Sequence, residues 1–333
     1  MAERPKLVLA MRPDIVDLVL PTALRARLEA LADVHPGTVT DPTAPEAADA
    51  LAGARLLLTG WGCPVLDTAT LDRMPRLAAA IHAAGSVRHH ATPEVWARGI
   101  AVSSAADANA APVVEYTMAT IWLASHRALG TAAGYVAGRE PAMRLRQGAD
   151  GATVGVIGAS RIGRGVIARL TAAAAGFRVL LADPYVSAEE AEALGTTLVD
   201  LDDLCRRSDI VTVHAPDLPE TRHLLNAERL ALLRDGATVI NSARGRLVDT
   251  DALTHECGSG RIDAYIDVTD PEPLPVGHPL LSLRNVLITP HIAGCQGSEV
   301  QRLGAYAVDE VERWIKGEPL RGGVQAADLT RIA

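Results

Sequence analysis

The fold is decided by the stretch Thr153-Val-Gly-Val-Ile-Gly158-Ala-Ser160-Arg-Ile-Gly163, in which a short apolar run turns abruptly into a helical pattern. Gly158 permits a tight turn, and Gly163 lets the following helix pack closely against the strand. The free N–H groups and the positive dipole end of that helix then face a pyrophosphate. Ser160 stands where the usual motif has its middle glycine. The stretch predicts a dinucleotide-binding βα unit.

An acidic residue follows at the expected distance. The next apolar run ends at Asp183, about twenty residues after Gly163. A carboxylate there suits the adenine-side ribose hydroxyls of NAD, whereas the 2′-phosphate of NADP would meet like charge. We therefore expect NAD, with NADP less favoured. The alternative interpretation of Asp183 is a solvated turn acid, helped by Pro184.

Outward from this unit, short apolar runs alternate with helical patterns in two series. The first series has expected strands at 6–11, 54–59, 77–83 and 100–103, with a helix at 23–32. The second has expected strands at 153–157, 178–182, 210–213, 237–241, 261–267 and 286–289. Strands separated by helices pair in parallel. We expect an α/β fold with two Rossmann-like or flavodoxin-like doubly wound parallel-sheet domains.

Three further segments are predicted, whose ends are marked less clearly by turn residues. A helical period begins at Pro112 and runs to about Arg127, and 131–149 is a looser Gly-rich stretch. After Gly297 an amphipathic helix runs to about Lys316.

Composition excludes several classes of protein. The chain has 333 residues, 48% hydrophobic and 22% charged, which is ordinary globular composition with room for two domains. A net charge of −8 and 3% aromatic residues argue against nucleic-acid and lipid-surface partners. The four cysteines form no metal-ligand spacing, the N-terminus has no signal-peptide layout, and the longest apolar stretch, near 113–124, is too short for a bilayer. We expect a cytoplasmic protein.

Four segments after the fingerprint carry polar residues where strands should end. They are Ser208-Asp-Ile-Val-Thr-Val-His214-Ala-Pro216, Asn241-Ser-Ala-Arg244-Gly245, Asp267-Val-Thr-Asp-Pro-Glu272-Pro and Thr289-Pro-His291-Ile-Ala-Gly294. Each alone is consistent with a turn, a surface loop or a packed histidine. Together, in this order, they make the chain resemble the D-isomer-specific 2-hydroxyacid dehydrogenase family, which includes phosphoglycerate, glyoxylate/hydroxypyruvate, D-lactate and formate dehydrogenases. The resemblance is tight from Gly155 to Gly294 and looser in the N-terminal third.

The resemblance implies an NAD-dependent oxidoreductase acting on the CH–OH group of a small D-2-hydroxy acid, or on its 2-keto partner. Such a reaction needs a proton donor at the carbonyl oxygen and a cation for the carboxylate. His291 matches the family's general acid/base, and Glu272 matches the carboxylate that favours its imidazolium form. Arg244 matches the guanidinium that binds the substrate carboxylate.

The same resemblance places the cofactor. Asp267 matches the residue at the carboxamide end of the nicotinamide. The full set of cofactor-binding residues implied by the fingerprint and the family is Gly158, Ser160, Arg161, Ile162, Gly163, Asp183, His214, Ala215, Pro216, Ser242, Ala243, Asp267, His291 and Gly294.

A second Gly-containing turn, Ile81-His-Ala-Ala-Gly85-Ser86-Val87-Arg88, resembles the family's substrate cradle. Gly85, Ser86 and Val87 are the candidates that would join Arg244 in binding the substrate. The family usually has Asp or Asn where Arg88 stands, so Arg88 either binds a second anionic group or faces solvent. His82, His89 and His90 lack carboxylate or cysteine partners at ligand spacing, and no metal is expected.

The family architecture implies a discontinuous substrate domain, residues 1–106 and 297–333, and an NAD-binding Rossmann domain, residues 107–296, with the active site in the cleft between them. Residues 115–149 match the segment that builds the family's homodimer.

Two alternatives stay open. Formate dehydrogenases of this family have a Gln before Pro-x-Pro, whereas Glu272 favours the hydroxyacid branch. An NAD(H)-sensing corepressor shares the scaffold and can retain Arg, Glu and His. The sequence does not identify which 2-hydroxy acid is the substrate.

Overall fold

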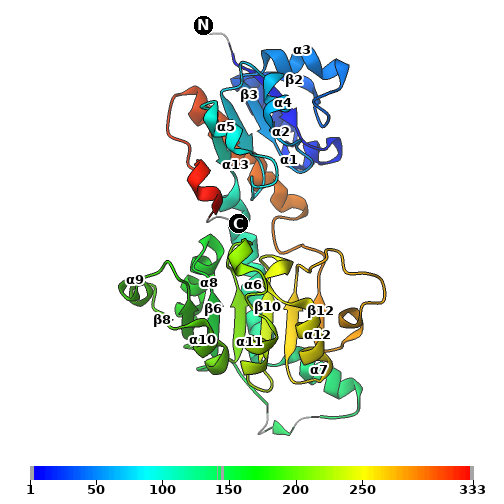
Figure 1. Ribbon diagram of the computed structural model, residues 1–333, viewed down its shortest axis with the longest axis vertical. Helices are drawn as coiled ribbons and strands as arrows, with labels where there is room; N and C mark the ends of the chain where they lie inside the picture. Colours follow the sequence, from blue (N-terminus) through cyan, green and yellow to red (C-terminus); the bar gives the residue numbers. More distant parts are fainter. Residues whose placement is uncertain (1–3, 141, 144–145, 331–333) are drawn as a thin grey trace. The chain divides into compact units, whose positions relative to one another are not determined.

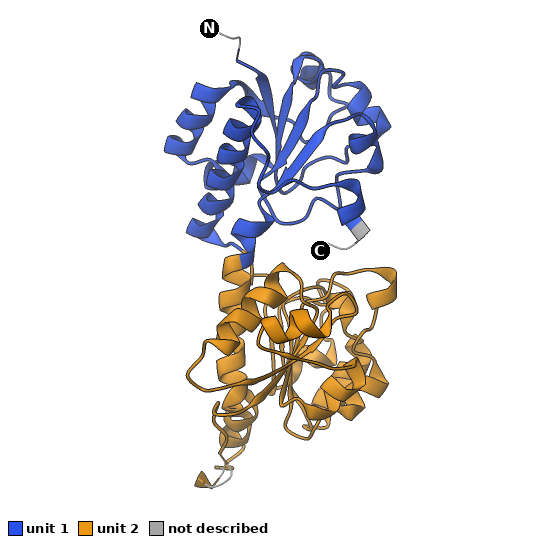
Figure 2. Ribbon diagram, turned by 90° about the vertical axis from the view of Figure 1, so that its left-hand side faces the viewer, with its two compact units in different colours: residues 1–110, 295–333 blue, residues 111–294 orange. Residues whose placement is uncertain are grey.

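The computed structural model describes residues 4–140, 142–143 and 146–330. The chain divides into two compact units, shown in blue and orange in Figure 2: unit 1 is Met1–Ala110 with Cys295–Ala333, and unit 2 is Ala111–Gly294. Each unit is built on one sheet in which all named strands pair in parallel. The predicted α/β class with two doubly wound sheets is confirmed.

Unit 1 has a five-stranded sheet in the order β2-β1-β3-β4-β5, which is the flavodoxin-like order. Its strands are β1 (Lys6–Ala10), β2 (Asp33–Thr38), β3 (Leu56–Thr59), β4 (Ala79–His82) and β5 (Ala101–Ser104). Its helices are α1 (Val16–Val19), α2 (Thr22–Leu31), α3 (Ala48–Gly53), α4 (Thr68–Asp72), α5 (Pro93–Ala97) and α13 (Val300–Ile315).

Unit 2 has a seven-stranded sheet in the order β12-β11-β10-β9-β6-β7-β8, a Rossmann order with one added edge strand. Its strands are β6 (Thr153–Ile157), β7 (Arg178–Ala182), β8 (Thr197–Leu198), β9 (Ile210–Val213), β10 (Thr238–Asn241), β11 (Asp263–Ile266) and β12 (Val286–Ile288). Its helices are α7 (Ala128–Val136), α8 (Arg161–Thr171), α9 (Ala188–Ala193), α10 (Leu201–Arg207), α11 (Ala227–Leu232) and α12 (Thr250–Gly258), and α6 (Ala106–Ser125) contains the boundary between the units.

Both sheets are covered on both faces, which is why their strands are continuous apolar runs. In β1, Leu7 and Leu9 pack in the layer of α1, α2 and α13, whereas Val8 and Ala10 pack in the layer of α3, α4 and α5. In unit 2, α10, α11 and α12 cover one face, and α6 and α8 cover the other (Figure 1). Alternate side chains therefore feed two apolar layers in each unit.

The chain order sets a switch point in each sheet. From β6 the chain proceeds to β7 and β8 on one side, and then returns to β9 on the other. In unit 1 the corresponding neighbours are β1 and β3. Ligands of doubly wound sheets bind beyond the carboxyl ends of the strands at such points.

The helix predicted to begin at Pro112 in fact begins at Ala106, so Pro112 lies inside α6. A proline within a helix leaves the carbonyl four residues earlier without its usual donor. Here the Cys295 thiol donates to that carbonyl, Ala108 O, at 3.8 Å. This long-range contact is absent from the local sequence pattern, which explains the wrong start.

Two other expectations are corrected. Part of 131–149, predicted to be loose, forms the end of α7, none of whose residues is buried. The edge strands β2 and β8 were not predicted. β2 contains Pro36 and Gly37, both unfavourable in strands, and it pairs with β1 through an irregular register. No helix among the described residues has both the length and the apolarity needed to cross a bilayer.

The C-terminal segment returns to β5. Gly323 pairs with Ser103 in an antiparallel bridge. The buried carboxylate of Glu310 accepts hydrogen bonds from Ser103 Oγ and from the backbone N–H groups of Arg321 and Gly322. A Cβ atom at Gly322 would lie 2.2 Å from the carbonyl oxygen of Ser104, so only glycine fits there.

Candidate active site

The glycine turn after β6 fits a dinucleotide. Gly158 has φ +92°, and a Cβ atom there would lie 2.7 Å from the backbone nitrogen of Ala215. A Cβ atom at Gly163 would lie 2.0 Å from Gly158 O, so the helix approaches the turn as closely as backbone allows. Neither glycine places a side chain at the N-terminus of α8, where Arg161 and Ile162 lie, and this helix end suits a pyrophosphate.

Ser160, which replaces the middle glycine of the motif, has a structural task. Its hydroxyl oxygen caps α8 by accepting the N–H of Gly163 at 3.3 Å. Capping by serine stabilises a helix by about 1 kcal/mol. The departure from glycine is thus compatible with the predicted turn.

Asp183 lies directly after β7, as predicted. Its two carboxylate oxygens accept the N–H groups of Ala159, at 2.7 Å, and Tyr185, at 2.8 Å. The side chain therefore joins the end of β7 to the glycine turn. A carboxylate has about four acceptor positions, so these two bonds leave capacity for ribose hydroxyls.

The segment after β9 forms the other side of the switch point. His214 is fully buried; Thr212 Oγ1 lies 2.9 Å from its Nε2, while its Nδ1 has no hydrogen-bond partner among the described residues. Burial lowers the pKa of His214 to about 3, so the ring is neutral at pH 7. Pro216 O accepts the hydroxyl of Thr221 at 2.6 Å. The unpartnered Nδ1 of His214 and the adjacent turn, where Gly158 and Gly163 have no Cβ atom, are both consistent with a bound dinucleotide.

The loop after β10 presents Arg244. The buried side chain of Asn241 shapes this loop, because its amide donates to Arg244 O at 2.8 Å and accepts the N–H of Ala243 at 3.1 Å. Ser242 Oγ lies 2.9 Å from Thr117 Oγ1 of α6. Gly245 abuts the backbone of the 267–273 loop, since a Cβ atom there would lie 2.0 Å from Thr269 O.

His291 and Glu272 come together although they follow different strands. Nδ1 of His291 and Oε1 of Glu272 are 2.8 Å apart, and the side chains are 49% and 43% exposed. With Nδ1 donating to the carboxylate, Nε2 is the nitrogen left to exchange a proton. The structure thus brings together the pair that the sequence predicted.

Asp267, after β11, is buried and central to this region. Its carboxylate accepts Thr289 Oγ1 at 2.7 Å, Ile292 N at 2.8 Å and Ala293 N at 2.9 Å. Half-buried Gly294 follows. Three of about four acceptor positions are used, so one remains for a carboxamide N–H.

In unit 1 the predicted substrate turn follows β4. Gly85 and Ser86 are half-buried and Val87 is buried, and the N–H of Arg88 donates to Ser86 Oγ at 3.4 Å. A Cβ atom at Gly85 would lie 3.2 Å from Nδ2 of Asn109. Within 4–140, 142–143 and 146–330, no three His, Cys, Asp or Glu side chains are grouped to hold a metal ion.

Three residues near the site were missed as candidates. They are Asn241, which shapes the Arg244 loop, and Tyr116 and Thr289, whose hydroxyl oxygens lie 2.7 Å apart beside Asp267. Asn241 and Thr289 lie within the quoted motifs, so their position at strand ends was the available signal. Tyr116 lies in α6, where no pattern in the sequence distinguishes it.

Sheet order and glycine turn together define a dinucleotide-binding protein of the doubly wound α/β class. The family model for the NAD-binding domain of D-isomer specific 2-hydroxyacid dehydrogenases matches residues 119–293. The chain belongs to the D-isomer-specific 2-hydroxyacid dehydrogenase family, and NAD(H) is the cofactor of its unit 2.

Known proteins resemble the chain to different extents. The D-3-phosphoglycerate dehydrogenase of Methanocaldococcus jannaschii is 38% identical over 226 residues, which make up 66% of this chain and 42% of that protein. The chain thus spans less than half the length of this curated relative. Among solved structures, the TT0316 protein of Thermus thermophilus is 30% identical, with a TM-score of 0.75 and coverage of 96% of this chain and 99% of that one.

A second structure bears on the cofactor. The D-isomer specific 2-hydroxyacid dehydrogenase of Xanthobacter autotrophicus, solved in complex with NADPH and MES, is 28% identical, with a TM-score of 0.74 and coverage of 98% and 99% of the two chains. NADPH, which carries a 2′-phosphate, is therefore bound by one protein that is similar to this chain.

Proposed function

We propose that this chain catalyses reversible oxidoreduction between NAD(H) and C2 of a small D-2-hydroxy acid or 2-keto acid. The observation that carries the proposal is the 2.8 Å contact between His291 Nδ1 and Glu272 Oε1, formed beyond the carboxyl ends of the nucleotide-binding sheet. A histidine oriented by a carboxylate is the arrangement that general acid–base catalysis uses.

Each residue has a defined task in the reducing direction. His291 Nε2 delivers a proton to the carbonyl oxygen, and Glu272 stabilises the imidazolium that this requires. Arg244 binds the carboxylate and polarises the carbonyl. NADH, when bound, supplies the hydride that reaches C2. In the oxidising direction His291 takes the proton back from the hydroxyl.

Unit 1 contributes the substrate cradle in this proposal. The backbone N–H groups of Gly85 and Ser86 receive the carboxylate, and Val87 anchors the turn. The proposed substrate domain is 1–106 with 297–333, and the proposed nucleotide domain is 107–296; residues 1–3 and 331–333 lie outside the described part of the chain. The division after Ala110 and before Cys295 supports these limits.

The proposal is tested by the rate of NADH oxidation with glyoxylate, hydroxypyruvate, pyruvate, phenylpyruvate and phosphohydroxypyruvate. Turnover that His291→Ala reduces by about 10²–10⁴-fold, with unchanged NADH affinity measured by calorimetry, supports the assignment. Full turnover in that variant contradicts the role of His291. Tight NADH binding without turnover on any acid points instead to a sensor.

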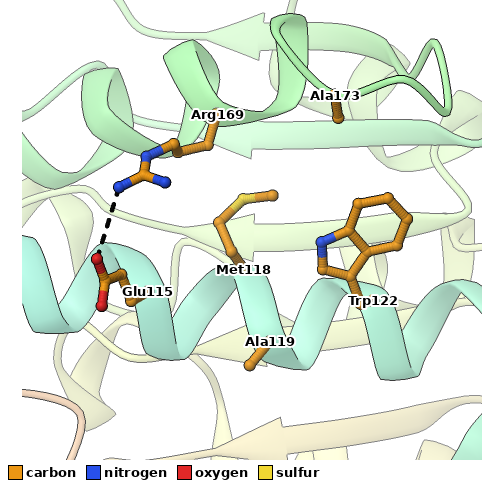
Figure 3. Close-up of a pocket in the computed structure, with 6 residues that line it drawn as sticks. All are labelled: Glu115, Met118, Ala119, Trp122, Arg169 and Ala173. Atoms are coloured by element: carbon orange, nitrogen blue, oxygen red, sulfur yellow. Dashed lines mark ion pairs between the residues drawn. The ribbon is translucent and has the colours of Figure 1, made fainter.

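We also propose that two copies of the chain associate through the segment 115–149, of which residues 141, 144 and 145 lie outside the described residues. Exposed apolar side chains gather on α6 and α7, namely Trp122, Leu123, Tyr135 and Val136. A groove of about 360 Å³ lies beside Trp122, and Glu115 and Arg169 in its lining form an ion pair at 3.5 Å. Figure 3 shows the lining side chains, with this ion pair at one end. A second copy would cover this apolar surface.

Light scattering tests the association. The wild-type chain should have the mass of a dimer, and the double variant Trp122→Glu and Tyr135→Glu that of a monomer. Leu281→Glu places one such charge on an exposed apolar residue outside the segment and should leave the mass unchanged. A monomeric wild-type chain at micromolar concentration would contradict the proposal.

The proposed compartment is the cytoplasm. Cys63, Cys205, Cys257 and Cys295 are all free thiols. Free, mostly buried thiols suit a reducing environment.

A further inference from the structure

Unit 1 has its own switch point, between β1 and β3. Met11 and Arg12 follow β1, and Gly60 and Trp61 follow β3. The two ends are joined, because the N–H of Arg12 donates to Trp61 O at 2.9 Å. By the general rule for doubly wound sheets, residues at this position face a ligand.

The loop that carries Trp61 is bonded to the proposed substrate turn. The N–H of Leu66 donates to His90 O at 2.7 Å, and Leu66 also forms a parallel bridge with Ala91. Thr92 Oγ1 donates to Leu66 O at 2.7 Å. Residues 60–66 and 83–91 therefore form one hydrogen-bonded rim at the carboxyl edge of the sheet.

Two apolar side chains of this rim remain exposed. Trp61 is 39% exposed and Val65 is 48% exposed. The backbone next to Trp61 is restricted, since Gly62 has φ +80° and a Cβ atom there would lie 2.3 Å from Cγ of Arg12. An indole that is open to solvent is suited to contact an apolar group.

We call the side chains of Thr59, Cys63, His82 and His90 the floor of the rim, and this floor is uncharged. Thr59 Oγ1 and His82 Nδ1 are 2.8 Å apart, and the rings of His82 and His90 lie 4.4 Å apart between centroids. Burial lowers the pKa of His82 well below its usual range and that of His90 to about 4, and raises the pKa of Cys63 to about 12. All four side chains are therefore neutral at pH 7.

Positive charge near the rim is limited. Nε of Arg12 lies 3.2 Å from Oδ1 of Asp14, and its Nη2 donates to Oδ2 at 3.2 Å, so this guanidinium is already paired. Arg88 is the one lysine or arginine of the rim itself. A phosphate over the neutral floor would lose hydration without gaining a buried counter-charge.

We propose that Trp61 and Val65 form the wall that receives the group on C3 of the substrate, so that the preferred 2-keto acid has an uncharged, apolar C3 group rather than a phosphorylated one. This inference rests on the proposed function and names its substrate class. Covering an apolar group with the indole removes both apolar surfaces from water, which favours binding.

The test compares kcat/KM for phenylpyruvate, 4-methyl-2-oxopentanoate and 3-phosphohydroxypyruvate, with glyoxylate, which has no C3, as reference. We expect the apolar acids to exceed the phosphorylated acid by at least about tenfold. Trp61→Ala should lower the ratio of phenylpyruvate to glyoxylate by at least about tenfold, and Trp61→Phe should retain most of it, because a ring still forms the wall.

A second pair of variants guards against misfolding. Val65→Thr is nearly isosteric and should lower the same ratio by about threefold or more. Val276→Thr makes the same change at a fully exposed valine of unit 2 and should leave the ratio within twofold. Thermal unfolding of each variant shows whether it is folded.

The opposite outcomes are distinct. Preference for 3-phosphohydroxypyruvate, lost in Arg88→Gln, overturns the inference and makes Arg88 the selecting residue, while turnover of glyoxylate remains consistent with the proposed function. If no acid turns over, the proposed function fails, and calorimetry decides the inference: binding of phenylpyruvate that Trp61→Ala abolishes supports it, and absence of binding overturns it.

Discussion

Asp267 holds the backbone of His291 in place. The carbonyl oxygen of Asp267 accepts the N–H of His291 at 2.8 Å, and its carboxylate accepts the N–H groups of the next two residues. His291 has φ +54°, a left-handed conformation that residues other than glycine seldom adopt. Such a conformation costs on the order of 1–3 kcal/mol, and the bonds from Asp267 offset that cost.

Replacing Asp267 by Asn should therefore reduce kcat. The amide presents one oxygen and one NH₂ group to two backbone donors, and a buried N–H without an acceptor costs about 1–3 kcal/mol. We expect at least a roughly tenfold fall in kcat and a lower Tm. Thr289→Val removes one bond and keeps the carboxylate, so its effect on kcat should be smaller. Wild-type kcat in Asp267→Asn would show that His291 needs no such support.

The charge of Glu272 is tested by Glu272→Gln, which can still accept the hydrogen bond from His291 Nδ1. If stabilisation of the imidazolium matters, kcat/KM for the keto acid should fall on the order of 10–100-fold. Glu46→Gln, at an exposed site in unit 1, is the matched control and should behave as wild type. Equal rates in the two variants would remove Glu272 from the mechanism.

The steric need for Gly163 predicts a large effect of one methyl group. Gly163→Ala places a Cβ atom 2.0 Å from Gly158 O, so the helix must shift and NADH affinity should fall at least about tenfold. Gly258→Ala is the control, because a Cβ atom there meets nothing within 4 Å. Calorimetric titration with NADH measures both. Unchanged affinity in Gly163→Ala would argue against this turn as the pyrophosphate site.

Asp183 predicts cofactor preference. We expect kcat/KM for NADH to exceed that for NADPH by about tenfold or more, because the 2′-phosphate would lie beside a carboxylate. Asp183→Ser should reduce the preference, since serine is uncharged and still offers a hydroxyl. Near-equal efficiency of the wild type with both cofactors would refute this role for Asp183.

Buried neutral histidines predict loss of stability in mild acid. The folded-state pKa values of His82, His90 and His214 are all lowered by burial, the last two to about 4 and about 3. Below about pH 6.5 the unfolded chain binds protons that the folded chain refuses, so stability falls as pH falls. Each histidine adds up to about 1.4 kcal/mol per pH unit.

Urea unfolding between pH 7.5 and 5.5 measures this slope above the range where most carboxylates titrate. His214→Asn should reduce the slope of the free energy of unfolding against pH by the contribution of about one proton. A slope equal to that of the wild type would mean that His214 is not neutral because of burial.

The nucleotide-binding sheet was predictable because its signals are local. β6, β7 and β9 are short apolar runs, and Gly158 and Gly163 are required by contacts within the turn and with the neighbouring strand end. β2 was not predictable, since Pro36 and Gly37 oppose strand formation and only pairing with β1 overrides them.

The candidate site also contains some features that local sequence predicts and others that depend on how distant strands pair. The positions of Arg244, Glu272 and His291 after strand ends were predictable, because each lies in a motif that carries the family resemblance; their roles remain proposals. The support of His291 by Asp267 was not, because their contacts depend on how β11 and β12 pair. The role that we propose for Trp61 likewise depends on the neighbouring positions of β1 and β3, which the sheet order reveals.

The return of the C-terminal segment to β5 has a consequence for association between molecules. An open edge strand offers its N–H and C=O groups to strands of other molecules and so promotes aggregation. At β5, Ser104 N donates to Gly322 O and Val324 N donates to Val102 O, both at 2.9 Å, so this edge is occupied. The opposite edge strand, β2, contains Pro36, which has no N–H to donate. Both edges of the five-stranded sheet are thereby protected against intermolecular strand pairing.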